Sequence, residues 1–194
     1  MLLIGNPCIT DNQAHTQMAI WSIVAAPLIM GNDVRNMTQS TRDILLNRDA
    51  IAINQDKAGL QGGRITPFGT TEVWARNLSD GSVAVALLNK GSQSVSLNHG
   101  DASIQPPPRT LANGQPHPAN AQPLTHAEQE RMRVDLSDAA NASITVTLSQ
   151  LGITAKTADV YNVWAQKSVG TVTGSYTTSV PAGGTAFVRI TPKA

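Results

Sequence analysis

The sequence predicts an α/β segment followed by an all-β module. In residues 1–58 short apolar runs alternate with helical patterns, the order of a parallel α/β fold. After residue 64, short alternating runs separated by glycine, proline and asparagine are typical of an antiparallel sandwich. The length of 194 residues, with 41% hydrophobic and 14% charged side chains, suits one large domain or one and a half small ones.

The first part begins with a strand and a helix. Residues 2–4 form an apolar run that ends at Gly5, which suits a strand buried on both faces. Thr10 or Asp11 can cap the helix that follows. Its predicted buried stripe recurs at helical spacing and consists of Ala14, Met18, Trp21 and Ala25.

A second strand and a second helical region follow. Pro27 disfavours helical geometry in the residue before it and ends the first helix. Residues 28–30 then form a second short buried strand. Thr38 or Ser40 begins the next helix, and Asp49 restarts it through two further isoleucines.

The second part consists of short strands joined by turns. Asp80-Gly81 predicts a tight hairpin turn between two of them. The predicted strands are residues 71–75, 82–88, 94–97, 143–148, 159–164, 174–180 and 185–190. Residues 99–133 interrupt the series, with six of the eleven prolines and no aromatic side chain. We interpret this segment as an inserted surface loop, with a partner-binding polyproline segment as the alternative.

Composition excludes several classes of protein. The net charge of +1 creates no field that attracts nucleic acid or an acidic membrane surface. Residues 18–30 are the longest apolar run, but Pro27 interrupts it and a membrane helix needs roughly 20 residues. Residues 1–4 lack the basic segment of a signal peptide. Cys8 is the single cysteine, so no internal disulfide forms. The histidines show no metal-binding spacing, and they are His15, His99, His117 and His126.

Several motifs occur in a fixed order along the chain. They are MLLIGN at 1–6, TQMAIW at 16–21, AAPLIMGNDVR at 25–35, IAINQD at 51–56, EVW at 72–74, VWAQK at 163–167 and VPAGG at 180–184. This order resembles the α-galactosidases and α-N-acetylgalactosaminidases of glycoside hydrolase family 27. The resemblance covers nearly the whole chain apart from the Pro-rich insertion.

The resemblance implies a catalytic (β/α)8 TIM barrel followed by an antiparallel β domain. A complete barrel needs about 250 residues. Residues 1–58 therefore correspond to the last quarter of the barrel, and residues 59–194 to the β-sandwich with its insertion at 99–133. We expect the chain to be a C-terminal fragment of the enzyme.

The function implied by the resemblance is retaining hydrolysis of terminal α-galactosides without a metal or organic cofactor. This reaction needs two carboxylates about 5 Å apart, which the family carries on earlier barrel strands. Arg48-Asp49 and residues 131–135 look superficially similar but lie elsewhere in the pattern, so no catalytic residue is assigned. The chain alone is expected to be inactive. The alternative is an accessory β-sandwich that binds carbohydrate or serves a structural role.

Few residues remain as site candidates. The resemblance transfers one substrate-binding position, Met1, although a frayed chain start is an equal interpretation. Asp33 either supports the sugar site or caps a turn, and we favour the cap. Trp21 is interpreted as core on the helix stripe, and Trp74 and Trp164 as sandwich core rather than as platforms that stack a sugar ring. The sequence leaves open the oligomeric state, the preference for galactose or N-acetylgalactosamine, and the compartment, for which the family offers secreted, periplasmic or lysosomal locations.

Overall fold

The computed structural model describes residues 1–6, 9–91 and 140–193. The predicted insertion at 99–133 and the predicted strand at 94–97 lie outside the described residues.

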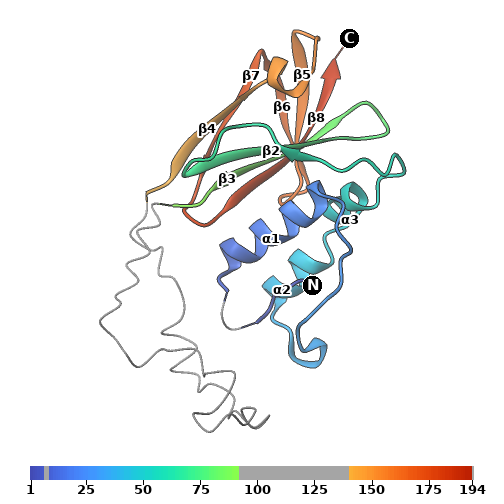
Figure 1. Ribbon diagram of the computed structural model, residues 1–194, viewed down its shortest axis with the longest axis vertical. Helices are drawn as coiled ribbons and strands as arrows, with labels where there is room; N and C mark the ends of the chain where they lie inside the picture. The colour runs from blue at the N-terminus through green and yellow to red at the C-terminus, as the bar shows by residue number, and fades with distance from the viewer. Residues whose placement is uncertain (7–8, 92–139, 194) are drawn as a thin grey trace, which may run out of the picture.

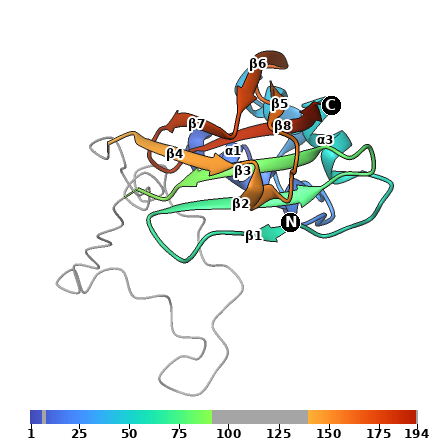
Figure 2. The same cartoon turned by 90° about the horizontal axis from the view of Figure 1, so that it is seen from above.

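The described chain forms three layers (Figures 1 and 2). A six-stranded antiparallel sheet is the middle layer, in the order β1-β2-β3-β8-β5-β6. Its strands are β1 (Gly63–Arg64), β2 (Thr71–Asn77), β3 (Val83–Asn89), β8 (Thr185–Lys193), β5 (Thr157–Asn162) and β6 (Lys167–Thr173). A two-stranded sheet of β4 (Ala142–Thr147) and β7 (Ser175–Val180) covers one face. The helices α1 (Asp11–Ile23), α2 (Gln39–Leu45) and α3 (Arg48–Asn54) cover the other. Two short 3₁₀ helices, η1 (Val34–Asn36) and η2 (Ser149–Leu151), complete the elements.

Strand β3 is buried along its entire length because both of its faces are covered. Val83, Val85 and Leu87 belong to the sandwich core between the two sheets. Ala84 and Ala86 alternate with them and face the helices. The small alanine side chains allow α1 to approach the sheet closely, so a single strand separates two hydrophobic cores.

The N-terminal helix α1 confirms most of its sequence prediction. Thr10 is the N-cap, and with Gln13 it forms a reciprocal capping box that satisfies two backbone N–H groups. Ala14 and Met18 are buried as predicted, and Trp21 is partly buried. The placement of Ala25 on the stripe was wrong, because the helix ends at Ile23 and Ala25 lies beyond it.

The end of α1 is set by a local hydrogen-bonded turn. The N–H of Ala26 donates to the carbonyl of Trp21 at 3.0 Å, and that of Ala25 donates to Ser22 at 3.4 Å. These are the two bonds of a Schellman motif, which needs a left-handed residue after the cap. Ala25 occupies that position with φ of 54°. The helix therefore ends four residues before Pro27, by a mechanism that the proline rule does not describe.

Replacing Ala25 by glycine is expected to stabilise the protein. The left-handed conformation costs a residue with a Cβ about 1 kcal/mol or more, and the greater unfolded-state entropy of glycine offsets part of the gain. We expect a net increase of about 0.5 kcal/mol in the free energy of unfolding, measured by urea denaturation. The matched control is Ala52→Gly, inside α3, which is expected to cost about 1 kcal/mol. Equal destabilisation by both substitutions would contradict the motif.

The two predicted parallel strands at 2–4 and 28–30 were only partly right. In the structure the two segments form a single parallel bridge, between Leu2 and Met30, instead of regular strands. Leu2 and Ile4 are buried as predicted, but Ile29 and Met30 are 60% and 48% exposed. A parallel strand becomes regular and buried when it has strands on both sides and helices on both faces. Within the described residues, the segment at 28–30 pairs only with Leu2.

The remaining elements resolve the alternatives that the sequence left open. Thr38, not Ser40, caps α2. Asn47 caps α3, and its side-chain amide also donates to the carbonyl of Val163 at 3.0 Å. Asp49 lies in the first turn of α3, where a carboxylate suits the helix dipole.

The Asp80-Gly81 turn is confirmed between β2 and β3, with Gly81 at φ of 81°. Strands β1 and β6 were not predicted.

A polar junction joins the helices to the sheet. Arg76 of β2 is 2% exposed, and its Nη1 donates to the carbonyls of Ser22, Ile53 and Asn54 at 2.6 to 3.1 Å. Gly62, just before β1, donates its N–H to the carbonyl of Ile23 at 2.9 Å. The carboxyl-terminal ends of α1 and α3 are thereby attached to the first strands of the sheet, because carbonyls of their last turns accept hydrogen bonds from Arg76 and Gly62.

Candidate functional site

The parallel bridge near the N-terminus joins two short segments, residues 1–6 and 28–35. The N–H of Leu2 donates to the carbonyl of Ile29 at 2.7 Å, and the N–H of Gly31 donates to Leu2 at 2.9 Å. Because the two segments are parallel, their carboxyl ends lie at the same side. Residues 5–6 and residues 31–33 follow these ends, and we call residues 1–6 and 28–35 the barrel edge.

Met1 lies at this edge beside Gly31. A Cβ added to Gly31 would come within 2.8 Å of the Met1 Cγ, so the glycine makes room for the methionine. Met1 is nevertheless 68% exposed, which leaves most of its side chain free of contacts in the described chain. This geometry does not test contact with a ligand, and the substrate-binding role of Met1 stays a prediction.

Asp33 is engaged within its own turn. Its side chain accepts a hydrogen bond from the N–H of Arg35 at 3.0 Å, and so caps η1. The guanidinium of Arg35 binds the same carboxylate through two further contacts of 2.9 and 2.7 Å. These hydrogen bonds from the Arg35 side chain and backbone lower the pKa of Asp33. The capping interpretation therefore accounts for the contacts of Asp33.

The aromatic candidates pack in the protein rather than forming an open platform. Trp21, Trp74 and Trp164 are partly buried against the core between helices and sheet. The sandwich-core placement of Trp74 and Trp164 was wrong, because both lie on the helix side of the six-stranded sheet. Trp164 follows the end of β5, donates to the carbonyl of Thr185 at 3.1 Å, and meets His15 edge to face at 4.8 Å. Its packing is therefore structural.

The remaining sequence candidates either contact a neighbouring side chain or lie outside the described residues. Asp49 accepts a hydrogen bond from the hydroxyl of Tyr161 at 2.9 Å, across the junction of α3 and β5. Cys8, residues 131–135 and the three other histidines, at 99, 117 and 126, lie outside the described residues. Across residues 1–6, 9–91 and 140–193, no group of three His, Cys, Asp or Glu side chains is arranged to hold a metal ion. None of the helices in those ranges is long and apolar enough to cross a membrane.

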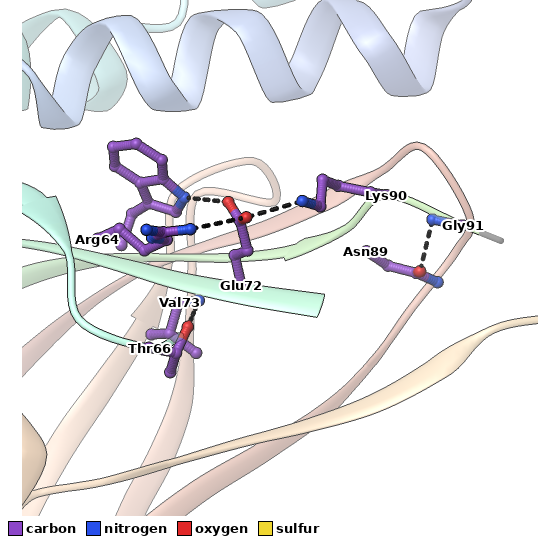
Figure 3. A network of polar contacts seen from close by, with 8 residues as sticks. Arg64, Thr66, Glu72, Val73, Asn89, Lys90 and Gly91 are labelled. Carbon is purple, nitrogen blue, oxygen red and sulfur yellow. Dashed lines mark hydrogen bonds and ion pairs between the residues drawn. The ribbon is translucent and has the colours of Figure 1, made fainter. Parts of the chain in front are cut away.

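The structure reveals a buried ionic cluster that the sequence analysis missed (Figure 3). Glu72 of β2 is 4% exposed, and its carboxylate accepts from Lys90 at 2.8 Å and Arg64 at 3.2 Å. Trp74 donates its indole N–H to the same carboxylate at 3.0 Å. The Arg64 guanidinium also lies 3.1 Å from the ring centre of Phe68. The only signal in the sequence was the Glu-x-Trp spacing, which places both side chains on one face of a strand.

Glu72 is expected to make stability dependent on acid pH. Burial raises the pKa of Glu72, but hydrogen bonds and charge from Lys90, Trp74 and Arg64 outweigh it and lower the pKa. A lowered folded-state pKa stabilises the fold above the unfolded value of about 4.3, and this contribution is lost as pH falls through the folded pKa. Glu72→Gln is expected to reduce the free energy of unfolding by about 3 kcal/mol at pH 7.

The measurement is urea denaturation of parent and Glu72→Gln between pH 7 and pH 3. The difference between the two proteins is expected to be constant above pH 5 and to shrink below pH 4, since both then carry a neutral side chain. Asp43→Asn, on the exposed face of α2, is the control and is expected to change stability by about 0.5 kcal/mol or less. A difference that does not vary with pH would exclude the ionised cluster as its cause.

Two family models match separate stretches of the chain. The family model described as "Alpha galactosidase A" matches residues 1–56. The model described as "Alpha galactosidase C-terminal beta sandwich domain" matches residues 68–113 and 131–190.

Curated relatives and solved structures agree with these matches. The chain is 42% identical over 97 residues to an α-galactosidase of Coffea arabica, covering 50% of this chain and 26% of that protein. It is 44% identical over 91 residues to an α-N-acetylgalactosaminidase of Gallus gallus, covering 46% and 22%. The crystal structure of α-galactosidase I from Mortierella vinacea superposes with a TM-score of 0.72 at 24% identity, covering 100% of this chain and 39% of that one. This last likeness shows the fold alone. The chain spans about a quarter of the length of the curated relatives it matches.

Proposed function

The chain belongs to the α-galactosidase family, and from this premise we propose that it forms the closing part of a retaining α-galactoside hydrolase. In this proposal the barrel edge completes a (β/α)8 barrel, and the sandwich supports it from behind. The boundary that we propose between the two parts is near residue 58, and the stretch between the end of α3 at Asn54 and the start of β1 at Gly63 is compatible with it.

The observation that carries the proposal is the apolar rim of the barrel edge. Large apolar side chains there are exposed, and they are Met1 at 68%, Leu3 at 40%, Ile29 at 60%, Met30 at 48% and Val34 at 54%. An exposed cluster of this kind indicates a surface that is covered in the working protein. Within the described residues the segment at 28–30 pairs only with Leu2, so its other side can pair with a further parallel strand.

In this proposal the catalytic groups and the substrate-binding wall come from opposite sides of the covered surface. Retaining hydrolysis takes one carboxylate as nucleophile and one as acid and base, with the two about 5 Å apart. We propose that the covering strands bring both carboxylates, while this chain supplies the wall at Met1 and residues 31–35. The chain alone is then expected to show no turnover, and the substrate is expected to be a terminal α-galactoside.

The test is a chimera in which this chain is joined in frame behind the part of the Coffea arabica α-galactosidase that precedes the matched region. The chimera is expected to hydrolyse p-nitrophenyl α-galactoside, whereas the chain alone is not. Ile29→Asp in the chimera is expected to lower activity about tenfold or more, because it places a charge in the covered surface.

Val169→Asp is the matched control, since Val169 is 50% exposed on β6, away from the barrel edge. It is expected to leave the activity of the chimera within about twofold of the parent. Hydrolysis by the chain alone would overturn the claim that the carboxylates lie elsewhere. Equal activity of the Ile29→Asp chimera and its parent would show that the barrel edge is not a covered surface.

A further inference from the structure

A hollow lies away from the barrel edge, where α3 meets the strands of the sandwich. It has a volume of about 460 Å³ and is enclosed by α3, the turn between β2 and β3, and the strands β5, β6 and β8. Pockets of about 300 to 1,000 Å³ hold small ligands. No residue of the barrel edge lines this hollow, which we call the junction cleft.

The cleft has a surplus of hydrogen-bond acceptors. Four carboxylates line it, from Asp49, Asp56, Asp80 and Asp159. An ionised carboxylate offers about four acceptor positions. In the described chain, Asp49 accepts one hydrogen bond, from the hydroxyl of Tyr161 at 2.9 Å. Asp159 accepts from Thr171 and Lys193 through the same oxygen, Oδ1. Acceptor positions therefore remain for a ligand rich in hydroxyl or N–H donors.

The other lining groups indicate whether the ligand donates through hydroxyl groups or through N–H groups. Arg189 reaches the cleft with its side chain 47% exposed and makes one loose ion pair with Asp80, at 3.6 Å. Its guanidinium offers N–H donors that a protonated amine cannot accept, whereas a hydroxyl group both donates and accepts. Apolar groups complete the wall, and they are Ala52, Ile53, Leu78, Val160 and Val163. A ligand with alternating hydroxyls and an apolar C–H face matches this combination.

We propose that the junction cleft binds a neutral mono- or disaccharide. The carboxylates of Asp49 and Asp159 accept from ring hydroxyls, Arg189 donates to a hydroxyl or ring oxygen, and the Tyr161 ring and neighbouring aliphatic groups contact the C–H face. Because α3 and the sandwich strands both contribute, the bound sugar also ties the two parts together. The proposal does not depend on the hydrolytic activity proposed above.

The experiment uses the full chain labelled with ¹⁵N and follows amide shifts during titration with galactose, melibiose, sorbitol and spermidine. The sugars are expected to shift the amides of Ala52, Ser79, Ser168 and Thr191, all around the cleft, and to leave those of residues 28–35 unchanged. Sorbitol, which carries hydroxyls without a ring face, is expected to bind at least about tenfold more weakly, as the apolar contacts are lost. Spermidine is expected to bind the cleft more weakly than either sugar at physiological ionic strength, where its non-specific attraction to the carboxylates is screened.

Two variants examine the residues that carry the proposal. Asp49→Asn keeps the size of the side chain, and Arg189→Gln shortens it and removes the guanidinium. Each substitution is expected to weaken sugar binding about tenfold. The matched controls are Arg42→Gln and Asp43→Asn on α2, which are exposed and do not line the cleft. They are expected to change affinity less than about twofold.

Three outcomes would overturn the proposal. The first is the absence of any cleft shift with either sugar. The second is spermidine binding at the cleft in preference to the sugars. The third is sugar binding whose shifts fall at residues 28–35 and which survives Arg189→Gln. Activity of the chimera is a separate measurement, so failure of the hydrolase proposal and failure of the cleft proposal are distinguishable.

Discussion

Gly62→Ala is expected to lower the free energy of unfolding by about 3 kcal/mol. A Cβ at this position would lie 2.6 Å from the Cβ of Arg76 and 2.8 Å from the carbonyl oxygen of Ile23, and it would also collide with the carbonyl oxygen of Ala75. Two of these three neighbours are backbone atoms, which cannot rotate away. The N–H of Gly62 donates to that same Ile23 carbonyl, so any shift also strains the attachment of α1.

The adjacent residue provides a matched control. Gly63→Ala adds the same methyl group where no atom lies within 4 Å, so it is expected to change stability by about 0.5 kcal/mol or less. Urea denaturation of both variants followed by circular dichroism measures the difference. If the two substitutions have equal effects, the close approach of α1 to the start of the sheet does not determine stability.

Arg76→Met is expected to destabilise the protein by a similar amount, about 3 kcal/mol or more. The substitution keeps a long flexible side chain but removes the donor to three carbonyls, from Ser22, Ile53 and Asn54. Within the described residues the Asn54 carbonyl would lose its donor, while those of Ser22 and Ile53 would keep only long bonds of 3.4 Å from Ala25 and Asp56. A buried carbonyl without a partner costs about 1 to 3 kcal/mol. Relief from burying the guanidinium offsets part of this cost, since burial lowers the pKa of Arg76 and the charge of Asp56 only partly counters it.

Arg76→Lys separates hydrogen bonding from packing. Its ammonium is expected to reach some of the carbonyls, so we expect about half of the loss seen with methionine. The matched control is Arg42→Met, at an exposed position of α2, which is expected to cost about 0.5 kcal/mol or less. If Arg76→Met is as stable as the parent protein, the bonds from Nη1 to the helix ends do not hold the two parts together.

Local sequence signals predicted the helix starts and the hairpin turn. Thr10 and Thr38 cap helices because a side-chain oxygen beside free N–H groups needs no distant partner. Gly81 permits the turn between β2 and β3 for an equally local reason. Ala25 was misplaced because a Schellman motif with alanine in the left-handed position has no signature in the residue type.

Long-range contacts explain most of the remaining errors. Trp74 and Trp164 lie in predicted strands, but a strand pattern does not predict which face of the sheet the helices cover. Glu72 read as one polar residue in a strand, although Lys90 lies eighteen residues away and completes its buried ion pair. Charged groups are buried only when partners from distant segments meet them, and sequence separation hides those partners.

By itself the sequence determined the α-galactosidase family, the order of the helices and of most strands, the hairpin turn, and a short choice of capping residues for two of the helices. The capping and turn residues depend on neighbours within a few positions. Family membership depends on the order of motifs, which can be recognised in the sequence without a structure. Only the tertiary structure decided that residues 28–30 remain largely exposed, that Arg76 attaches two helix ends to one strand, and that α3 and the sandwich enclose a cleft. Burial, ion pairing and cavities are properties of segments brought together in space, and no single segment specifies them.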